Sequence, residues 1–258
     1  MNILKKFAIF LLATLIIITN IFNTQINAFN ITFRAQTKEE EFNRIIKTIN
    51  EFPWFKRNNY NINRLTLPNH EFFKNIIKNP ELLSTIDINH LRNIFYIEIY
   101  DASAFNKGLD KLQQIKIIVE SIFSKLIPLN KSWGFKIIPK YEILLTLYGS
   151  NGSYNSLTGR IIIKTTKNGI FNLNPSNTII HEIVHIGIEE NIINKYKLTQ
   201  DEKERVVDLI CSKYLNEYIS EYEFQEVGNQ NLDPFITEKG ILKNLPVAIE
   251  KYIAQYPR

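Results

Sequence analysis

The feature that most constrains this chain is an apolar segment, residues 174–191, that carries two histidines and a glutamate among isoleucine and valine residues. A helix that is apolar on nearly every side is buried in the core of a protein. His181, Glu182 and His185 would be buried with it, and buried polar side chains need polar partners. The fold therefore has to bring other polar groups to this segment.

His181 and His185 lie four residues apart, so about 400° of rotation and about 6 Å of rise place both imidazoles on one face of a helix. Two imidazoles at this spacing can bind one Zn²⁺ at about 2.0–2.1 Å. Glu182 is offset from His181 by about 100°, a poor direction for a third ligand but a good one for reaching a water on the metal. This is the arrangement of an H-E-x-x-H motif, with two ligands and one general base. The alternative, two surface histidines and a solvated glutamate, fits the apolar flanks less well.

A catalytic zinc site needs a third protein ligand and one open position. No histidine follows His185 in the sequence. Glu189 lies on the same helix face, but its rise of about 12 Å from His181 is too large for both to bind one ion. A carboxylate on another helix is therefore expected as the third ligand.

Residues 199–202 read Thr-x-x-Glu, a capping box that predicts the start of the next helix. Glu204 lies near the start of this helix, and Asp208 follows four residues later on the same face. We predict that Glu204 is the third metal ligand and that Asp208 accepts the outer N–H of a metal-bound histidine. The alternative is an ordinary charged helix face, which fits Asp208 poorly because valine, leucine and isoleucine surround it.

The pattern His181-Glu182-x-x-His185, followed by Glu204-x-x-x-Asp208 on a second helix, resembles the gluzincin group of zinc metallopeptidases, of which thermolysin is the familiar member. The resemblance is to a minimal form of the catalytic core. It implies a zincin-like fold, Zn²⁺ as cofactor and a peptide or protein as substrate. It also implies that Glu182 is the catalytic base and that His181, His185 and Glu204 are the metal ligands.

This resemblance covers about residues 141–214 and has departures. Lys203 and Val207 stand where thermolysin-like motifs have asparagine and serine, and no downstream histidine is available to stabilise an oxyanion. A tyrosine is expected to take that role. Tyr196, between the two metal helices, is the first candidate, and Tyr154 is a weaker one.

Residues 160–165 are rich in isoleucine and predict a strand. In the gluzincin group a similar strand lies at the sheet edge and pairs with extended substrate, so we expect substrate antiparallel to 160–165. Further strands are predicted at 94–100, 135–138 and 141–148. Residues 149–159 are rich in glycine, serine and asparagine and read as a turn.

The predicted elements comprise a long helix near 109–123, a small mixed sheet and two ligand-bearing helices. This order predicts an α+β fold with a zincin-like core and an N-terminal helical extension. We assign residues 101–258 to a metallopeptidase domain and residues 29–100 to a mostly helical region. A final helix is predicted at 245–255.

Residues 1–28 have the pattern of a signal peptide or an N-terminal anchor. Lys5 and Lys6 precede an apolar run, residues 7–22, and Ala28 is a small residue suited to a cleavage site. The rest of the chain is therefore expected outside the cytoplasm, either periplasmic or secreted, or associated with a membrane through residues 7–22.

The formal net charge of +5 is spread along the chain, so a solvated basic surface is expected and a nucleic-acid partner is not. Cys211 is the single cysteine, which excludes an intramolecular disulfide, and its apolar neighbours predict a buried thiol. Two other classes of function stay open at this point. The chain could be a non-catalytic zinc-binding protein with the same fold, or a membrane-tethered interaction protein.

Overall fold

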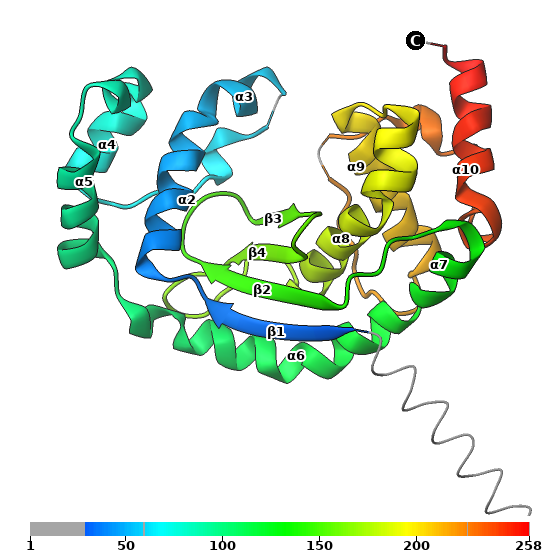
Figure 1. Ribbon diagram of the computed structural model, residues 1–258, viewed down its shortest axis with the longest axis horizontal. Helices are drawn as coiled ribbons and strands as arrows, with labels where there is room; N and C mark the ends of the chain where they lie inside the picture. Colours follow the sequence, from blue (N-terminus) through cyan, green and yellow to red (C-terminus); the bar gives the residue numbers. More distant parts are fainter. Residues whose placement is uncertain (1–28, 59, 226, 258) are drawn as a thin grey trace, which may run out of the picture.

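The computed structural model describes residues 29–258 except residues 59, 226 and 258 (Figure 1). The segment predicted to be a signal peptide or an anchor, residues 1–28, lies outside the described residues. Within the described part of the chain, no helix is both long enough and apolar enough to cross a membrane.

The chain has an α+β fold in which helices surround a small mixed sheet (Figure 1). Two π-helical turns, Glu189–Asn194 and Ile210–Tyr214, extend α8 (Pro175–Ile188) and α9 (Gln200–Leu209). The strands and α-helices are β1 (Asn30–Ala35), α2 (Lys38–Asn50), α3 (Phe52–Arg57), α4 (Glu71–Lys78), α5 (Ile88–Ile94), α6 (Asn106–Ser124), α7 (Ile127–Trp133), β2 (Lys140–Thr146), β3 (Gly152–Asn155), β4 (Arg160–Lys164), α8 (Pro175–Ile188), α9 (Gln200–Leu209) and α10 (Glu238–Gln255).

The sheet has the strand order β1-β2-β4-β3. β1, β2 and β4 are parallel, and β3 pairs antiparallel with β4 at one edge. Alternating side chains such as Tyr141, Ile143 and Ile161 are fully buried. α6 packs on β1, α8 packs on β3 and β4, and the two helices contact each other. The apolar side of the sheet and these two helices therefore form the centre of the core.

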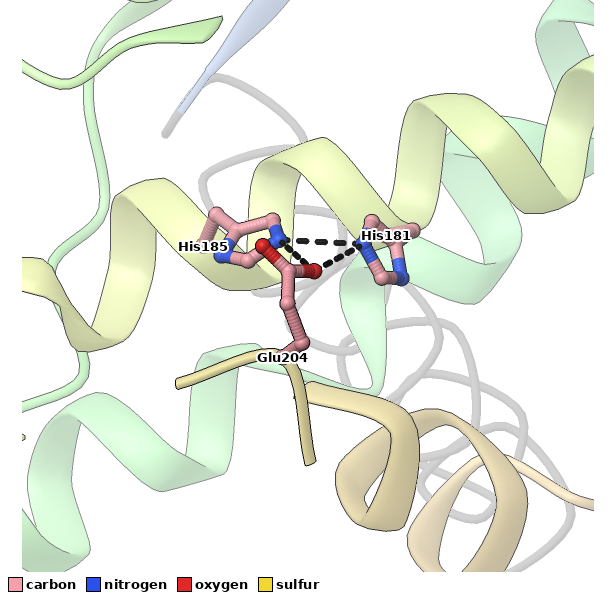
Figure 2. Close-up of side chains that lie close together, drawn as sticks. All are labelled: His181, His185 and Glu204. Atoms are coloured by element: carbon pink, nitrogen blue, oxygen red, sulfur yellow. Dashed lines mark hydrogen bonds and ion pairs between the residues drawn. The ribbon is translucent and has the colours of Figure 1, made fainter. Parts of the chain in front are cut away.

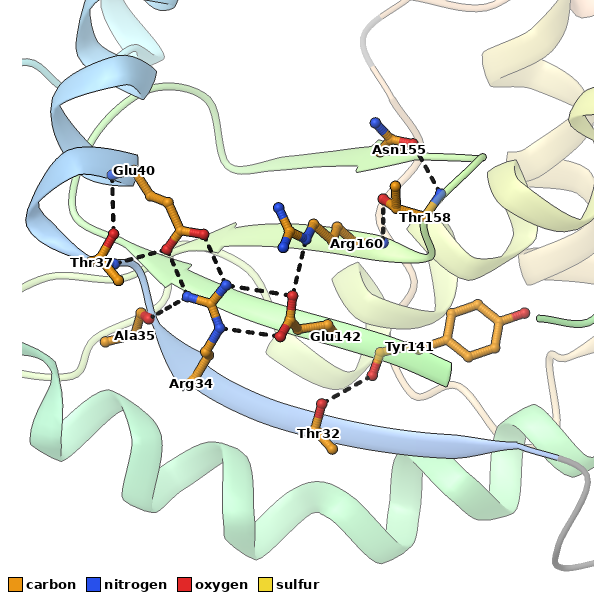
Figure 3. A network of polar contacts seen from close by, with 10 residues as sticks. All are labelled: Thr32, Arg34, Ala35, Thr37, Glu40, Tyr141, Glu142, Asn155, Thr158 and Arg160. Carbon is orange, nitrogen blue, oxygen red and sulfur yellow. Dashed lines mark hydrogen bonds and ion pairs between the residues drawn. The ribbon is translucent and has the colours of Figure 1, made fainter. Parts of the chain in front are cut away.

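Arg34 on β1 is the centre of a polar network on the sheet (Figure 3). Its guanidinium donates to Glu40 at the start of α2, at 2.6 and 2.8 Å, and to Glu142 on β2, at 3.1 Å. Arg160 on β4 donates to the same Glu142 at 3.0 Å. The hydrogen bonds from Arg34 hold the pKa of Glu40 down to about 2. The network fixes where α2 leaves the sheet, and α2 forms one side of the cavity described below.

Several sequence predictions about the strands are wrong. Residues 30–35 were expected to be helical or irregular, but they form β1 because β2 supplies a parallel partner about 110 residues later. Residues 94–100 were expected to be a strand, but they continue α5 as a π-helical turn, Phe95–Ile99. Residues 135–138 form no strand, and the backbone N–H of Lys136 instead donates to the carbonyl of Gly187 on α8 at 2.8 Å.

The prediction that residues 160–165 form an edge strand is also wrong. Strand β4, at residues 160–164, has β2 on one side and β3 on the other, so it offers no open edge to a substrate. The two edge strands are β1 and β3, and the one that packs against α8 is β3, which lies inside the segment predicted to be a turn. β3 has only four residues and no β-branched or apolar alternation, so its strand character depends on pairing with β4 and not on local propensity.

Helix α8 lies unusually close to the segment before β2. The ring of Phe135 lies where the Cβ of any larger residue at Gly187 would be. A glycine at this helix position costs about 1 kcal/mol relative to alanine. That cost is offset by the close approach, which seats α8 against the core and fixes the depth of its polar residues.

Glu41 on α2 is a buried carboxyl group away from the histidines. It is 0% exposed, and its Oε1 accepts a hydrogen bond from the backbone N–H of Leu147 at 3.2 Å. Its Oε2 has no hydrogen-bond partner among the described residues. Burial raises the pKa of Glu41 to about 7, so the folded protein favours the protonated form.

The wild type should lose stability as pH rises, in part because Glu41 is buried. We predict that Glu41→Gln removes the part of this loss that Glu41 causes. The folded pKa lies above the unfolded value of 4.5, so folding binds a proton between these two values and stability falls as pH rises through about 7. The loss that Glu41 causes in the wild type is on the order of 3 kcal/mol. Because Glu182 also has a pKa raised to about 7, urea unfolding at pH 5 and pH 8 should show a smaller loss in Glu41→Gln than in the wild type, and an unchanged loss in Glu120→Gln, a half-exposed control. An equal loss in all three would contradict the prediction.

Candidate metal centre

Helix α8 begins where the sequence predicts. Asn174 caps it by accepting a hydrogen bond from the backbone N–H of Ser176 at 3.0 Å, and Pro175 occupies the first helical position. The helix is buried along almost its whole length. His181 and His185 are 6% and 2% exposed, so neither is a surface histidine.

The structure brings His181, His185 and Glu204 together (Figure 2). The two Nε2 atoms are 3.0 Å apart, and Oε2 of Glu204 lies 3.5 Å from Nε2 of His181 and 3.2 Å from Nε2 of His185. Ligands bound to a tetrahedral ion at about 2.0–2.1 Å are themselves about 3.3 Å apart. The three distances fit one shared ion, so this buried group could hold a metal.

Helix α9 delivers Glu204 to the two imidazoles. The expected capping box is present, with Thr199 and Glu202 each bonded to the other's backbone N–H. The side chain of Gln200, one turn before Glu204, donates a hydrogen bond to its Oε1. Oε1 is therefore held by the helix, while Oε2 faces the histidines. Glu202 also accepts a hydrogen bond from Tyr252 on α10 at 2.7 Å, which ties α9 to the C-terminal helix.

The charges of Glu204 and His185 suit metal binding, whereas His181 would have to lose a proton to bind a metal. Burial lowers the pKa of His181, but its contacts with Cys211 and Glu204 outweigh burial and raise that pKa. Burial alone would raise the pKa of Glu204, but the two facing imidazoles outweigh it and hold that pKa well below its usual range. Burial lowers the pKa of His185 to about 4, so this imidazole is neutral at pH 7. A carboxylate and a neutral imidazole are the protonation states that bind a metal ion.

Tyr222 and Asp208 orient His181. Nδ1 of His181 lies 2.7 Å from the hydroxyl of Tyr222, and that hydroxyl donates to Oδ1 of Asp208 at 2.8 Å. Since the one proton of Tyr222 goes to Asp208, its oxygen accepts from Nδ1–H of His181. This fixes the tautomer that leaves the lone pair of Nε2 directed at the ligand group.

The predicted role of Asp208 is therefore wrong in its geometry. Oδ1 of Asp208 is 4.0 Å from Nδ1 of His181, too far for a direct hydrogen bond, and Tyr222 lies between them. Asp208 is 0% exposed, and it also accepts from the backbone N–H of Gln225 at 3.1 Å. No sequence spacing points to Tyr222, because it lies in an irregular segment after α9.

His185 is held by stacking. Its ring packs face to face on Tyr154 of β3, with centroids 4.9 Å apart and an interplanar angle of 10°. The hydroxyl of Tyr154 donates to Glu189 at 2.6 Å and accepts from Nζ of Lys203 at 3.3 Å. Nδ1 of His185 has no hydrogen-bond partner in the described part of the chain. Glu189 thus acts on the site through Tyr154 and not as a ligand.

Glu182 faces the edge strand. A Cβ at Gly152 on β3 would overlap its Oε1, so the missing side chain at Gly152 makes room for this carboxyl group. Glu182 is 7% exposed, and burial raises its pKa to about 7. A carboxyl group with this pKa exchanges protons readily near neutral pH.

Arg44 on α2 fixes the edge strand beside Glu182. Its guanidinium donates to the carbonyl of Tyr148 and to the hydroxyl of Ser153, both at 3.0 Å, and to Ser150 at 3.3 Å. These bonds join α2 to the β2–β3 connection and to β3 itself. The position of β3 relative to α8 is therefore set by a side chain from the N-terminal region.

A cavity of about 550 Å³ lies over the metal centre. α2 and α3 form one wall, α8 and α9 form the other, and residues 150–154 with β3 lie between them. The polar residues that face it include Arg44, Tyr60, Tyr154, Lys203, Gln200 and Glu221, together with His181, Glu182, His185 and Glu204. A cavity of this size can enclose a small molecule or a short stretch of peptide.

The other residues considered from sequence lie elsewhere. Tyr196 does not line the cavity, and its hydroxyl donates to Glu250 on α10 at 2.8 Å. It is therefore the wrong candidate for oxyanion stabilisation. His70 contacts Glu98 at 3.3 Å, and His90 is on α5. Cys211 is buried, as expected, and burial raises the pKa of its thiol.

Comparisons with protein-family models, with curated proteins and with solved structures found no match for this chain. The metal centre is therefore interpreted from its own chemistry. Two imidazoles and one carboxylate suit several first-row divalent ions, so the donor set limits the metal without selecting one.

We predict that Glu204→Gln abolishes tight binding of Zn²⁺, because it removes the carboxylate oxygen that faces both imidazoles. The loss should exceed the roughly 10–100-fold cost of removing an outer-shell partner. Glu189→Gln is the matched control, because Glu189 is a neighbouring carboxylate that bonds Tyr154 instead of the ligand group. Competition with a chelator of known affinity measures both. Full zinc affinity in Glu204→Gln would move the third ligand elsewhere.

Proposed function

We propose that this protein is a zinc-dependent peptidase that works outside the cytoplasm. The observation that carries the proposal is that the polar residues of α8 face two different groups. His181 and His185 face Glu204 and one another, while Glu182, next to His181, faces the edge strand and the cavity. A purely structural metal site needs no carboxyl group beside its open side. The location is proposed from the pattern of residues 1–28.

Zn²⁺ is proposed as the metal because the donor set is joined to an H-E-x-x-H helix. When bound, it would lower the pKa of a coordinated water toward about 7 and polarise a carbonyl group. A nearby cation would also favour the ionised form of Glu182, which burial alone disfavours. The base would then be ionised at neutral pH, when it is needed.

Glu182 would act first as a base and then as an acid. It accepts a proton from the attacking water and delivers that proton to the amine nitrogen of the leaving peptide. His181, held by Tyr222, and His185, held by Tyr154, keep fixed positions during these proton transfers. No covalent link between enzyme and substrate is required.

The edge strand β3 replaces residues 160–165 as the proposed site of substrate pairing. β3 is bonded to β4 on one side only, and it lies beside Glu182 at the floor of the cavity. An extended peptide can add to an open sheet edge through backbone hydrogen bonds, which recognise the main chain whatever its sequence. Peptide bonds are thus the class of substrate that this geometry favours.

Tyr60 replaces Tyr196 as the proposed oxyanion donor. Its hydroxyl accepts a hydrogen bond from Gln200 at 3.1 Å, and Gln200 in turn donates to Glu204. Burial and the charge of Glu204 raise the pKa of Tyr60 to about 12, so the hydroxyl keeps its proton at neutral pH. It lines the cavity and can donate that proton to a developing negative charge.

We predict that Glu182→Gln retains zinc but loses peptidase activity. The substitution keeps the size of the side chain and removes the base, so kcat/KM for a casein or peptide-library substrate should fall on the order of 10³-fold. Zinc content should stay at the wild-type stoichiometry. Zinc bound by both proteins with cleavage by neither would favour a non-catalytic zinc-binding protein. A wild-type protein that binds no zinc would contradict the proposal.

We predict that Tyr60→Phe lowers kcat about 10²-fold with little change in KM, because the lost hydroxyl acts only when charge develops on the carbonyl oxygen. The phenyl ring that remains preserves the packing. Tyr196→Phe is the matched control, since Tyr196 lies outside the cavity, and it should retain wild-type kcat. Equal activity of the two variants would exclude Tyr60 from this role.

A further inference from the structure

Three aromatic side chains of the N-terminal region form a cluster on the cavity wall. Trp54 and Tyr60 stack with centroids 5.4 Å apart and an interplanar angle of 28°. Phe55 meets Trp54 edge-on at 5.4 Å and Tyr60 edge-on at 5.8 Å. All three line the same cavity as the metal centre. We refer to Trp54, Phe55 and Tyr60 as the aromatic wall.

We propose that the aromatic wall is a specificity subsite that binds an apolar side chain of the peptide substrate, close to the bond that is cleaved. This inference rests on the proposed peptidase function and names the class of peptide that the site selects. The occupant is a large aliphatic or aromatic side chain, because the ring faces offer a broad area for dispersion contacts. Ring faces also attract cations, so a preference for Lys over Leu and Phe in the test below would overturn this choice.

The aromatic wall is connected to the metal centre. Tyr60 is its innermost member, since the Tyr60 hydroxyl is bonded to Gln200 and Gln200 is bonded to the ligand Glu204. Trp54 and Phe55 extend from Tyr60 along α3. A peptide whose carbonyl group lies at the metal would therefore place a neighbouring side chain against these rings.

The wall is exposed to the cavity and does not complete the core. Trp54 is 39% exposed, although it is the largest side chain on α3. Neither Trp54 nor Phe55 belongs to the apolar core formed by the described residues. The charged neighbours Lys47 and Glu51 contact one another at 3.7 Å, so their opposite charges do not set a preference for a charged occupant. A half-exposed aromatic cluster beside a metal centre is a surface that an apolar ligand group would cover.

The described residues of the wall and the segment after it are bonded to other parts of the fold. The backbone N–H of Tyr60 donates to the carbonyl of Phe55 at 3.0 Å. Lys164 on β4 donates to the carbonyl of Arg64 at 2.7 Å and to the hydroxyl of Thr66 at 3.0 Å. Thr66 also forms a β-bridge with Gly149. A wall that is already ordered loses little conformational entropy when a side chain docks on it.

The test is a series of peptides that differ at one residue beside the cleaved bond, with Leu, Phe, Ala, Asp or Lys at that position. The zinc-loaded wild type should prefer Leu and Phe over Ala by about 10–200-fold in kcat/KM, the usual range for apolar pockets. Trp54→Ala should reduce this preference to within about threefold, because it lowers kcat/KM for the Leu and Phe peptides far more than for the Ala peptide. Phe72→Ala, on α4 and outside the cavity, is the matched control and should keep the full preference.

Correct folding of each variant is checked by its zinc stoichiometry and its circular dichroism. If Trp54→Ala fails this check, Trp54→Leu and Phe55→Ala take its place, since each keeps part of the apolar volume. Tyr60→Phe should lower kcat for every peptide by the same factor and leave the preference unchanged. A change of preference in Tyr60→Phe alone would overturn the assignment of Trp54 and Phe55 as the selecting surface.

Binding can be measured without cleavage. The sequence has two tryptophans, Trp54 and Trp133. Trp133 does not line the cavity, and its indole donates to the carbonyl of Ile241. In the zinc-loaded Glu182→Gln protein, the Leu and Phe peptides should change the tryptophan fluorescence and the Asp peptide should not. Trp54→Phe in this background should abolish the change.

The outcomes separate the two proposals. Selective binding without cleavage by the wild type would contradict the peptidase and keep the subsite. Cleavage with no preference among the peptides would overturn the subsite and keep the peptidase. Equal fluorescence changes for the Leu and Asp peptides would also overturn the subsite.

Discussion

The structure depends on the burial of three polar side chains on one apolar helix. His181, Glu182 and His185 are almost entirely buried, so each has to be matched by groups from elsewhere in the chain. Glu204 supplies the negative charge that faces both imidazoles. An ion at this point would satisfy two Nε2 lone pairs and the carboxylate together, a better solution than the three groups can give one another.

The matching groups come from three parts of the fold, which are α9, the segment after it and β3, and each imidazole is held in a different way. A hydrogen-bonded chain through Tyr222 sets the tautomer of His181, whereas stacking on Tyr154 sets the ring plane of His185. Neither the hydrogen bonds of Tyr222 nor the stacking on Tyr154 holds Glu182. The missing side chain at Gly152 leaves room for its carboxyl group, which faces the cavity. The two imidazoles are thus each held by a neighbouring side chain, whereas the carboxyl group of Glu182 stays accessible from the cavity. This difference is what a catalytic site requires and a structural site does not.

The sequence predicts the parts of the site that depend on local periodicity. The caps at Asn174 and Thr199 mark two helices, and spacing along them points to Glu204. Partners from distant segments have no regular spacing from the helix residues that they contact. Tyr222 and Tyr60 could therefore not be predicted from the sequence. Strand β3 was missed for the same reason, since only pairing with β4 makes it a strand. Gln200 carried a usable signal, because glutamine four residues before Glu204 can reach its carboxylate on a helix.

The pairing of β1 with β2 has a consequence for how the site is assembled. Asn30 and Lys140 are about 110 residues apart in sequence, whereas the ligands on α8 and α9 lie within about 23 residues. Closing the longer loop costs only about 1.4 kcal/mol more in chain entropy, so the difference is minor for stability. It matters more for the order of events, because distant contacts form later than local ones. Helices α8 and α9 can therefore pack together early in folding. The opposite side of the cavity, formed by α2 and α3, takes its position only after β1 has paired with β2.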